Sequence, residues 1–333
     1  MTATTADLSM NETPYPPPPA IAALITADTH RLHRYPSNTV APLIGALAGR
    51  LGVPAGQVLV GPGSAGLIQH LIQSLGPART DVIVPALSFE AYPLLVANAG
   101  ARPVPVAMAG LDQDLDATAA AITGNTRCVL LCNPNNPTGT ALRRDALHRF
   151  LDRVPPDVPV ILDEAYREFV TDPDVPDGVE LARGRDNVCV TRTFSKAYGL
   201  AALRIGYAVA PQHLAGPARM TGAVFFPNTF AQNAALACLD AAVEAEVTAR
   251  CTAVTGERDR LTSELTARGI PVAGSQANFV WLPLGDGADA FTARCAEAGI
   301  LVRGYPGVGV RVTVGTTADN DRLLSTVAAA VPR

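Results

Sequence analysis

The sequence predicts an α/β fold, with a mostly parallel central sheet covered by helices on both faces and a smaller α+β domain. Up to about Phe230, short apolar segments alternate with longer helix-like stretches. Several of these segments are near-continuous runs of Val, Ile and Leu, which is typical of strands that are buried on both faces. Alternation of this kind favours a parallel sheet between two layers of helices.

Seven strand candidates make up the predicted central sheet. In chain order they are Gln57–Val60, Asp81–Pro85, Ala101–Val106, Arg127–Cys132, Val158–Leu162, Val188–Thr191 and Arg204–Val209. Helices are predicted between them, for example over Ser64–Leu75 and Arg143–Arg153. Ligands of such sheets bind beyond the carboxyl ends of the strands, so the residues that follow each strand are candidates for chemistry.

The pattern changes after Phe230, which indicates the smaller domain. Its predicted elements are helices over Ala231–Arg250 and Arg258–Arg268, strands over Phe279–Leu282, Leu301–Arg303 and Gly309–Val314, and a final helix from Asn320. We therefore expect an N-terminal arm over residues 1–30, a large domain over 31–230 and a small domain over 231–333.

Composition narrows the class of protein. Hydrophobic residues make up 48% of the 333 residues and charged residues 17%, which allows a large core and argues against disorder. A net charge of −4 argues against a nucleic-acid-binding surface. No apolar run is long enough to span a membrane, and Met1–Met10 does not resemble a secretory signal, so we expect a cytoplasmic protein.

The six cysteines point to buried thiols rather than to a metal site. None of them lies in a CxxC pair, and the five histidines do not cluster with them. A zinc site needs clustered Cys and His ligands. We therefore expect free, buried cysteines and no metal site.

Lys196 is the only lysine in the chain, since the other 25 of its 26 basic residues are arginine. An arginine guanidinium cannot lose its proton in a protein, so it cannot form a Schiff base. A lysine amine can do so when its surroundings lower its pKa, and it then attacks carbonyl groups. An arginine-rich composition also explains a low lysine count, so the neighbours of Lys196 must decide between chance and chemistry.

A glycine-rich turn over Gly61–Gly66 follows a strand candidate and opens a helix, which is the setting of a dinucleotide fingerprint. That fingerprint also needs an acidic residue at the end of the next strand, and Asp81 instead precedes its strand. A nicotinamide cofactor is therefore disfavoured. The free N–H groups of Ser64 and Ala65 at the start of the helix still suit a phosphate group.

Acidic and amide side chains follow two buried strands. Asp163 closes the run Val160–Leu162, and a buried acid is costly unless it is paired. Asn136 lies in the Pro- and Gly-rich segment Asn133–Gly139, which would hold its side chain rigidly. Taken singly, Asp163 is also explained as a helix cap, and Asn136 as ordinary turn chemistry.

Phosphate ligands and an aromatic residue complete the set. Thr193, Ser195 and Arg204 surround Lys196 in the sequence, and arginine suits bidentate phosphate contacts. Phe89 follows its own strand and could stack on a ring, although a core position explains it equally well. Together, a lysine, a buried acid, ring-oxygen donors, an aromatic plate and a phosphate cup suit pyridoxal 5′-phosphate.

With these motifs, the chain resembles the class I/II aminotransferases of the fold-type-I pyridoxal-phosphate superfamily, and most of all the histidinol-phosphate aminotransferase family. The resemblance runs from about Asn11 to the C-terminus. It is carried by Arg34-Tyr35-Pro36, Gly61–Gly66, Asn133–Gly139, Asp163–Tyr166, Ser195-Lys196 with Arg204, and Arg311–Thr316.

The resemblance implies a role for each cofactor-binding residue. Lys196 would bond the cofactor covalently and move the proton, and Asp163 would pair with its ring nitrogen. Asn136 and Tyr166 would hold the ring oxygen. The phosphate would be bound by the following set: the backbone of Ser64 and Ala65, the side chains of Thr193, Ser195 and Arg204, and Tyr35 of the neighbouring protomer.

The last contact implies a homodimer with shared active sites. For the substrate, the resemblance implies that Arg311 binds a carboxylate and that Arg303 helps to receive the distal group. The implied reaction transfers an amino group between an amino donor and a 2-keto acid. The short N-terminal arm and the tight turn over Tyr305–Gly307 leave histidinol phosphate, an aromatic amino acid or a specialised metabolite as possible donors.

Other reactions remain open at this stage. A decarboxylase, lyase or oxidase begins from the same bonded substrate, and the sequence does not show which Cα bond is broken. A cofactor-sensing regulator would need a DNA-binding segment, for which the chain has neither the length nor the basic charge.

Overall fold

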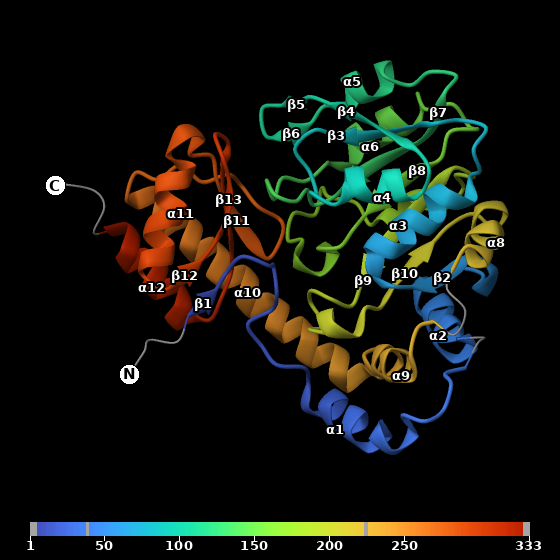
Figure 1. The fold of residues 1–333 in the computed structure, drawn as a ribbon, viewed down its shortest axis with the longest axis horizontal. Coiled ribbons are helices and arrows are strands. Elements are labelled where there is room, and N and C mark those ends of the chain that lie inside the picture. The colour runs from blue at the N-terminus through green and yellow to red at the C-terminus, as the bar shows by residue number, and fades with distance from the viewer. Residues whose placement is uncertain (1–4, 38–39, 223–225, 329–333) are drawn as a thin grey trace.

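A computed structural model of the chain describes residues 5–37, 40–222 and 226–328. Its centre is a seven-stranded sheet in which all seven predicted central strands are present (Figure 1). From edge to edge the strands are β2 (Val58–Gly61), β10 (Gly206–Val209), β9 (Val188–Thr193), β8 (Val160–Asp163), β7 (Thr126–Cys132), β3 (Asp81–Pro85) and β4 (Arg102–Val106). In this sheet only β10 is antiparallel to its neighbours, which confirms the mostly parallel prediction.

Helices cover both faces of this sheet. Successive side chains of a strand point to opposite sides, so each buried strand packs against two helical layers. On β7, Cys128 and Leu130 pack with one helical layer, and Val129 and Leu131 pack with the other. The first layer contains α3 (Gly63–Ser74), α4 (Tyr92–Asn98) and α8 (Gln212–Met220). The second contains α5 (Leu115–Ala120), α6 (Arg144–Leu151) and α7 (Gly178–Ala182).

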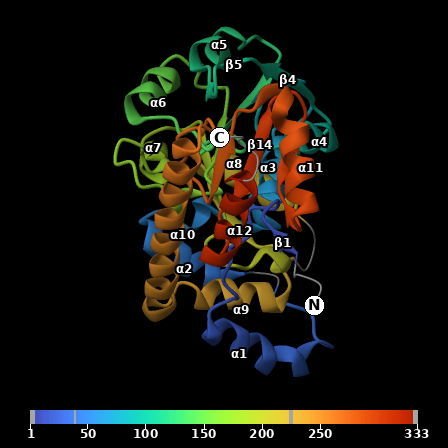
Figure 2. The same ribbon diagram turned by 90° about the vertical axis from the view of Figure 1, so that its left-hand side faces the viewer.

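A second unit lies beside the central sheet and is called the C-terminal unit here (Figures 1 and 2). It contains a three-stranded antiparallel sheet and two helices: β11 (Phe279–Leu282), β14 (Gly309–Thr313), β13 (Arg303–Tyr305), α11 (Ala288–Glu297) and α12 (Thr317–Ala328). The N-terminal strand β1 (Ala6–Asp7) pairs in parallel with β12 (Ile300–Leu301) of this region. The chain therefore starts beside the C-terminal unit, next forms the central sheet, and comes back to form the C-terminal unit itself.

The long helix α10 (Ala241–Ala267) links the two parts. It contacts η3 (Arg167–Phe169), which follows β8, and also β11 and α12. At its beginning lies α9 (Thr229–Ala237), which packs against α1 (Pro19–Asp28) and α2 (Ala41–Leu51). Both views show α1 and α9 side by side. The remaining short elements are η1 (Thr29–Arg31), η2 (Ala55–Gln57), β5 (Met108–Ala109), β6 (Asp112–Gln113), η4 (Ala201–Leu203) and η5 (Gly285–Gly287).

The boundary predicted between the helices over Ala231–Arg250 and Arg258–Arg268 is wrong. The chain breaks at 238–240, between α9 and α10, and then stays helical up to Ala267. Gly256 lies between the two predicted helices, at an exposed position of α10, where glycine costs only about 1 kcal/mol. Buried residues before and after it hold the helix: Val247, Cys251, Val254, Leu261 and Leu265.

Two predictions near the C-terminus are also corrected. The single strand expected over Leu301–Arg303 is two strands, because β12 pairs with β1 whereas β13 pairs with β14. The last helix begins at Thr317 rather than at Asn320. Thr316 and Asp319 cap its start, since the Asp319 N–H donates to Thr316 Oγ1 and the Thr316 hydroxyl donates to the Asp319 carboxylate at 2.6 Å.

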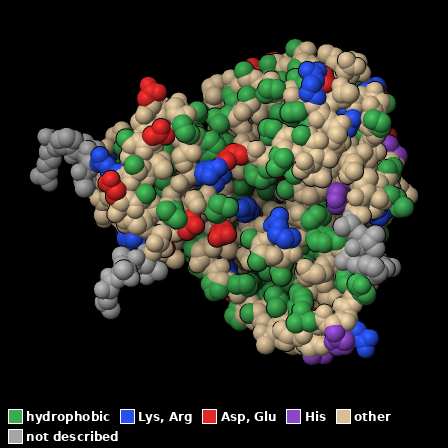
Figure 3. Space-filling model, in the orientation of Figure 1, with side chains coloured by type: hydrophobic (Ala, Val, Ile, Leu, Met, Phe, Trp, Pro, Cys, Tyr) green, Lys and Arg blue, Asp and Glu red, His purple; other side chains and the backbone are tan. Residues whose placement is uncertain are grey.

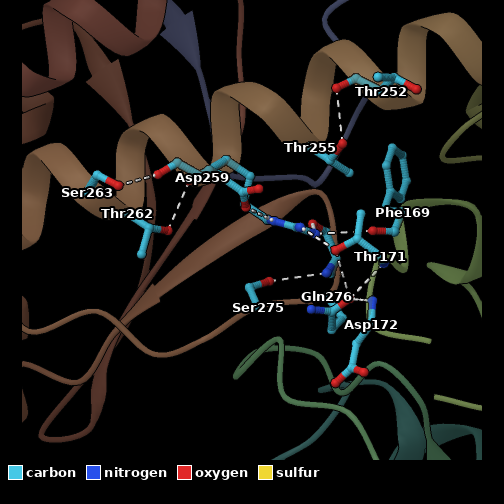
Figure 4. Close-up of polar contacts among 12 residues, drawn as sticks. Phe169, Thr171, Asp172, Thr252, Thr255, Asp259, Thr262, Ser263, Ser275 and Gln276 are labelled. Atoms are coloured by element: carbon cyan, nitrogen blue, oxygen red, sulfur yellow. Dashed lines mark hydrogen bonds and ion pairs between the residues drawn. The ribbon is translucent and has the colours of Figure 1, made fainter. Parts of the chain in front are cut away.

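Polar contacts join α10, the segment after η3 and the segment before β11 (Figure 4). The Gln276 side-chain oxygen accepts from the Thr171 N–H at 2.8 Å and from the Asp172 N–H at 3.0 Å. Arg258 of α10 donates to the carbonyl oxygens of Phe169 and Ala277 at 3.1 and 3.2 Å. These contacts fix the C-terminal unit to the strand ends of the central sheet.

The described residues contain no group of three or more His, Cys, Asp and Glu side chains placed to hold a metal ion. All six cysteines are free and buried, as predicted. Within the same described ranges, no helix has the length and hydropathy to cross a bilayer.

Candidate active site

A cavity of about 630 Å³ lies at the carboxyl ends of β3, β7, β8 and β9, beside the first turn of α3. Residues Met10–Glu12 of the arm and two arginines of the C-terminal unit complete its wall. Figure 3 shows acidic and basic side chains side by side where the C-terminal unit meets the rest of the molecule. Twelve of the predicted site residues line the cavity: Ser64, Ala65, Phe89, Asn136, Asp163, Tyr166, Thr193, Ser195, Lys196, Arg204, Arg303 and Arg311.

Lys196 lies just beyond β9, and its amine faces the cavity. Burial lowers the pKa of this amine to about 8, and the nearby guanidinium groups of Arg311 and Arg204 add to the effect. Its Nζ donates to the carbonyl oxygen of Met10 at 3.1 Å. A lysine with this pKa has a reactive neutral fraction at neutral pH, which is what a nucleophilic amine requires.

Asp163 is the last residue of β8 and is buried. Burial raises the pKa of its carboxyl to about 6, although hydroxyl groups partly offset the effect. Tyr92 donates to Oδ2 at 2.9 Å and Thr191 donates to Oδ1 at 3.2 Å. No cationic side chain among the described residues forms an ion pair with it. A cation placed in the cavity would therefore be strongly favoured beside this carboxylate.

The predicted phosphate ligands form a cup at the start of α3. The Thr193 hydroxyl donates to Ser195 Oγ at 2.9 Å, and Arg204 Nη1 lies 3.4 Å from the same oxygen. The first backbone N–H groups of a helix have no partner within it, so those of α3 are free for an anion. Hydroxyl groups, a guanidinium and helix N–H groups are together suited to bind a phosphate monoester.

Two glycines let the backbone approach this cup. Gly63 has a φ of 72°, and a Cβ built there would lie 3.0 Å from Nη2 of Arg204. A Cβ at Gly206 would lie 2.6 Å from the carbonyl oxygen of Arg192 and 2.8 Å from the carbonyl carbon of Gly63. A larger residue at Gly206 would therefore clash with the backbone, and one at Gly63 would crowd the Arg204 side chain.

Arg311 and Asn136 meet across the cavity from the two parts of the molecule. Nη1 of the arginine donates to Asn136 Oδ1 at 2.5 Å, and Nη2 donates to the carbonyl oxygen of Ser9. Its Nε is buried and has no partner among the described residues. Tyr166 lies nearby and accepts a hydrogen bond from Asn11 Nδ2 at 2.9 Å. Burial raises the pKa of the tyrosine phenol, so it stays protonated.

Phe89 is half-buried at the cavity wall, where its ring packs edge-on against Tyr92 with 5.4 Å between the centroids. Tyr92 was not among the predicted site residues, although it lies three residues after Phe89 and donates to Asp163. Asn11 and Glu90, which line the cavity, were not predicted as site residues either. No strong sequence pattern marks Asn11 or Glu90, because the residues that they contact, Tyr166 and Arg303, lie far away in the sequence.

Tyr35 is the one predicted site residue that does not line this cavity, and its side chain is 81% exposed. Its predicted contact is with the cofactor of a neighbouring protomer. A single chain does not test such a contact, so the role of Tyr35 stays a prediction.

Comparison with known sequences identifies the family. The family model described as aminotransferase class I and II matches residues 3–327. The chain belongs to this family. An aromatic amino acid aminotransferase of Streptomyces coelicolor is 50% identical over 318 residues, which cover 95% of this chain and 88% of that protein. A protein of the same name from Thermobifida fusca is 48% identical over 328 residues, which cover 98% of this chain and 90% of its own.

Solved structures agree with this assignment. A histidinol-phosphate aminotransferase of Sinorhizobium meliloti, solved in complex with pyridoxal 5′-phosphate, has a TM-score of 0.90 and 27% identity. The match covers 98% of this chain and 90% of that one. A Thermus thermophilus aspartate aminotransferase, at 23% identity with a TM-score of 0.85, shows the same fold over 98% of this chain and 92% of its own. The chain is therefore a fold-type-I, pyridoxal-phosphate-dependent aminotransferase, as predicted.

The cavity residues fit this cofactor. Asp163 is a buried carboxylate without a cationic partner among the described residues, which suits a protonated pyridine nitrogen. The cup of Thr193, Ser195 and Arg204 suits the phosphate, and Gly63 puts no side chain between Arg204 and Thr193. The chain's single lysine lines the same cavity.

Proposed function

We propose that the protein transfers the amino group of aromatic amino acids to a 2-keto acid. The observation that carries this proposal is the 50% identity, over 95% of the chain, to a protein named as an aromatic amino acid aminotransferase. The cavity is compatible with an aromatic side chain, because Phe89, Ala91, Ala201 and Ala202 are among the residues that line it.

The site residues have separate tasks in this proposal. Arg311 binds the substrate's α-carboxylate, since its Nε is buried without a partner among the described residues and its Nη1 already meets Asn136. Nζ of Lys196 would take and hold the proton of the substrate Cα, a role that its pKa near 8 suits. Pyridoxal phosphate, when bound, supplies an aldehyde and an electron-withdrawing ring.

The remaining ligands orient and hold the cofactor. Asp163 keeps the proton on the ring nitrogen by its negative charge. Asn136 and Tyr166 hold the ring oxygen, and Phe89 packs on the ring. The phosphate is bound by Ser64 and Ala65 through their backbone and by Thr193, Ser195 and Arg204 through their side chains. Arg303 lies at the distal end of the substrate.

A half-reaction screen tests the substrate. The purified holoenzyme is mixed with phenylalanine, tyrosine or histidinol phosphate without a keto acid, and the absorbance of the bound cofactor is followed. We expect conversion to pyridoxamine phosphate, with kcat/KM at least about tenfold larger for the aromatic amino acids. Conversion of histidinol phosphate alone would contradict the proposed substrate. Release of CO₂ without pyridoxamine phosphate would contradict transamination itself.

We also propose a homodimer with shared active sites, a cytoplasmic location, and the division into residues 1–30, 31–230 and 231–333. The homodimer is supported by large apolar side chains that are exposed in the single chain. Tyr35 is 81% exposed and Leu32 is 72% exposed, both near the end of η1. Met220 and Leu94 are exposed as well. Leu32 and Tyr35 lie close together in the sequence, and an apolar surface formed by neighbouring residues favours a contact between subunits.

A further inference from the structure

Four cationic side chains of the described residues line the cavity, and three of them have tasks in the proposed reaction. Lys196 is the reactive amine, Arg204 binds the phosphate and Arg311 binds the α-carboxylate. The fourth, Arg303, is the only one of these four placed at the distal end. The charge that a substrate side chain meets there therefore depends on what Arg303 contacts.

Glu90 already contacts Arg303 in a bidentate ion pair. Nε of the arginine donates to Oε1 at 3.1 Å, and Nη2 donates to Oε2. Glu90 lies between β3 and α4 and Arg303 begins β13, so the pair joins the central sheet to the C-terminal unit. These hydrogen bonds hold the pKa of the Glu90 carboxyl below its usual value, which keeps it ionised at neutral pH.

This pair changes the charge at the distal end. A guanidinium binds carboxylates through planar pairs of N–H donors, and Glu90 occupies the Nε and Nη2 edge of Arg303. A substrate with a distal carboxylate or phosphate would have to bind Arg303 through Nη1 or displace Glu90, and in either case it would lie beside the negative charge of Glu90. A neutral ring meets no net charge there, and the apolar side chains of Phe89 and Ala91 flank Glu90 in the sequence and in the cavity wall.

The pair is half-exposed, with side-chain exposures of 49% for Arg303 and 41% for Glu90. Exposed ion pairs contribute little to folding stability, so removing the Glu90 charge should leave the fold intact. Its effect on a bound anion is more direct, because like charges brought together at a binding site discriminate against the wrong ligand.

We propose that Glu90 is a specificity-determining residue, whose carboxylate neutralises Arg303 and selects neutral aromatic substrates over substrates with an anionic distal group. This inference rests on the proposed function and deepens it. Arg303 alone would favour the opposite preference, for a phosphate or a second carboxylate.

Two unreactive ligands isolate this preference. Glutarate and 3-phenylpropionate each offer one carboxylate to Arg311 and differ at the distal end, where one is anionic and the other aromatic. Their dissociation constants are measured on the holoenzyme from the absorbance of the cofactor, for the natural protein and for Glu90→Gln. We expect the substitution to tighten glutarate about tenfold or more and to change 3-phenylpropionate by less than about threefold.

Glu244→Gln is the matched control. Glu244 forms a bidentate pair with Arg50, the two side chains are 38% and 36% exposed, and neither residue lines the cavity. It removes the same charge from the same kind of pair, and we expect it to leave both dissociation constants unchanged. In the double variant Glu90→Gln with Arg303→Ala, the gain for glutarate should disappear, because the freed guanidinium is its source.

The inference is overturned if Glu90→Gln leaves the ratio of the two dissociation constants unchanged, or if the double variant keeps the gain. These results are independent of the proposed reaction. The same preparations are tested with phenylalanine in the half-reaction, and failure of that conversion with a tenfold gain for glutarate would reject the aromatic substrate while supporting the role of Glu90.

Discussion

Asp163 is the residue at which burial and charge act most directly on the chemistry. It ends β8 in the core, where the hydroxyl groups of Tyr92 and Thr191 donate to its side chain and no described cation pairs with it. Burial raises the pKa of its carboxyl from 3.8 to about 6, so the folded chain holds a carboxylate that is unfavourable without a cation. The protonated ring of the cofactor would supply that cation.

Replacing Asp163 by Asn should stabilise the cofactor-free protein. Between pH 3.8 and about 6 the folded carboxyl keeps a proton that the unfolded one loses, so stability falls as pH rises through this window. The full penalty, about 1–3 kcal/mol, is present above pH 6. We expect denaturant unfolding to show Asp163→Asn more stable than the natural protein at pH 8 and equally stable near pH 3.5. A cofactor-free variant that is less stable at pH 8 would contradict this account.

At the residue scale, the sequence predicted the side chains that follow strands but not the partners that hold them. Asp163, Asn136 and Lys196 could be found because parallel strands bring their carboxyl ends to one edge. Asn11 and Glu90 could not, because their partners Tyr166 and Arg303 lie 155 and 213 positions away. No periodic pattern connects residues at such separations.

At the scale of elements, the central strands were predictable because both faces of the sheet are buried. Several of these strands are short apolar runs, and the structure contains all seven that were predicted. The division of α9 and α10 was not predictable in this way, because packing on one side of a helix can outweigh a local glycine. The split between β12 and β13 depends on β1, a strand from the other end of the chain.

Arg258 of α10 should contribute more to stability than an exposed arginine of the same helix. It is buried and donates to the carbonyl oxygens of Phe169 and Ala277, which would lose that partner in Arg258→Met. We expect the free energy of unfolding to fall by about 2–4 kcal/mol in denaturant titrations.

Arg268→Met is the control on the same helix. Arg268 is part-exposed and, among the described residues, bonds within its own turn to Glu264. We expect a loss below about 0.5 kcal/mol. Equal losses for the two substitutions would show that Arg258 does not clamp α10 to the strand ends.

At the scale of the whole molecule, one cavity is built from three distant parts of the chain. The arm contributes the carbonyl oxygens of Ser9 and Met10, which accept from Arg311 and Lys196. The central sheet contributes the cofactor ligands, and the C-terminal unit contributes Arg303 and Arg311. The cavity therefore forms only when these three parts are assembled. It lies at the carboxyl edge of the sheet, where ligand binding was predicted.

The central claim is that the amine of Lys196 bonds the cofactor, and the composition of the chain makes its test unusually direct. Besides the N-terminus, Lys196 is the only primary amine. The cofactor-free protein is saturated with pyridoxal phosphate, reduced with borohydride, digested and mapped by mass spectrometry. We predict a stoichiometric cofactor adduct on the peptide that contains Lys196. The absence of an adduct, or an adduct on the N-terminal amine alone, would contradict the account.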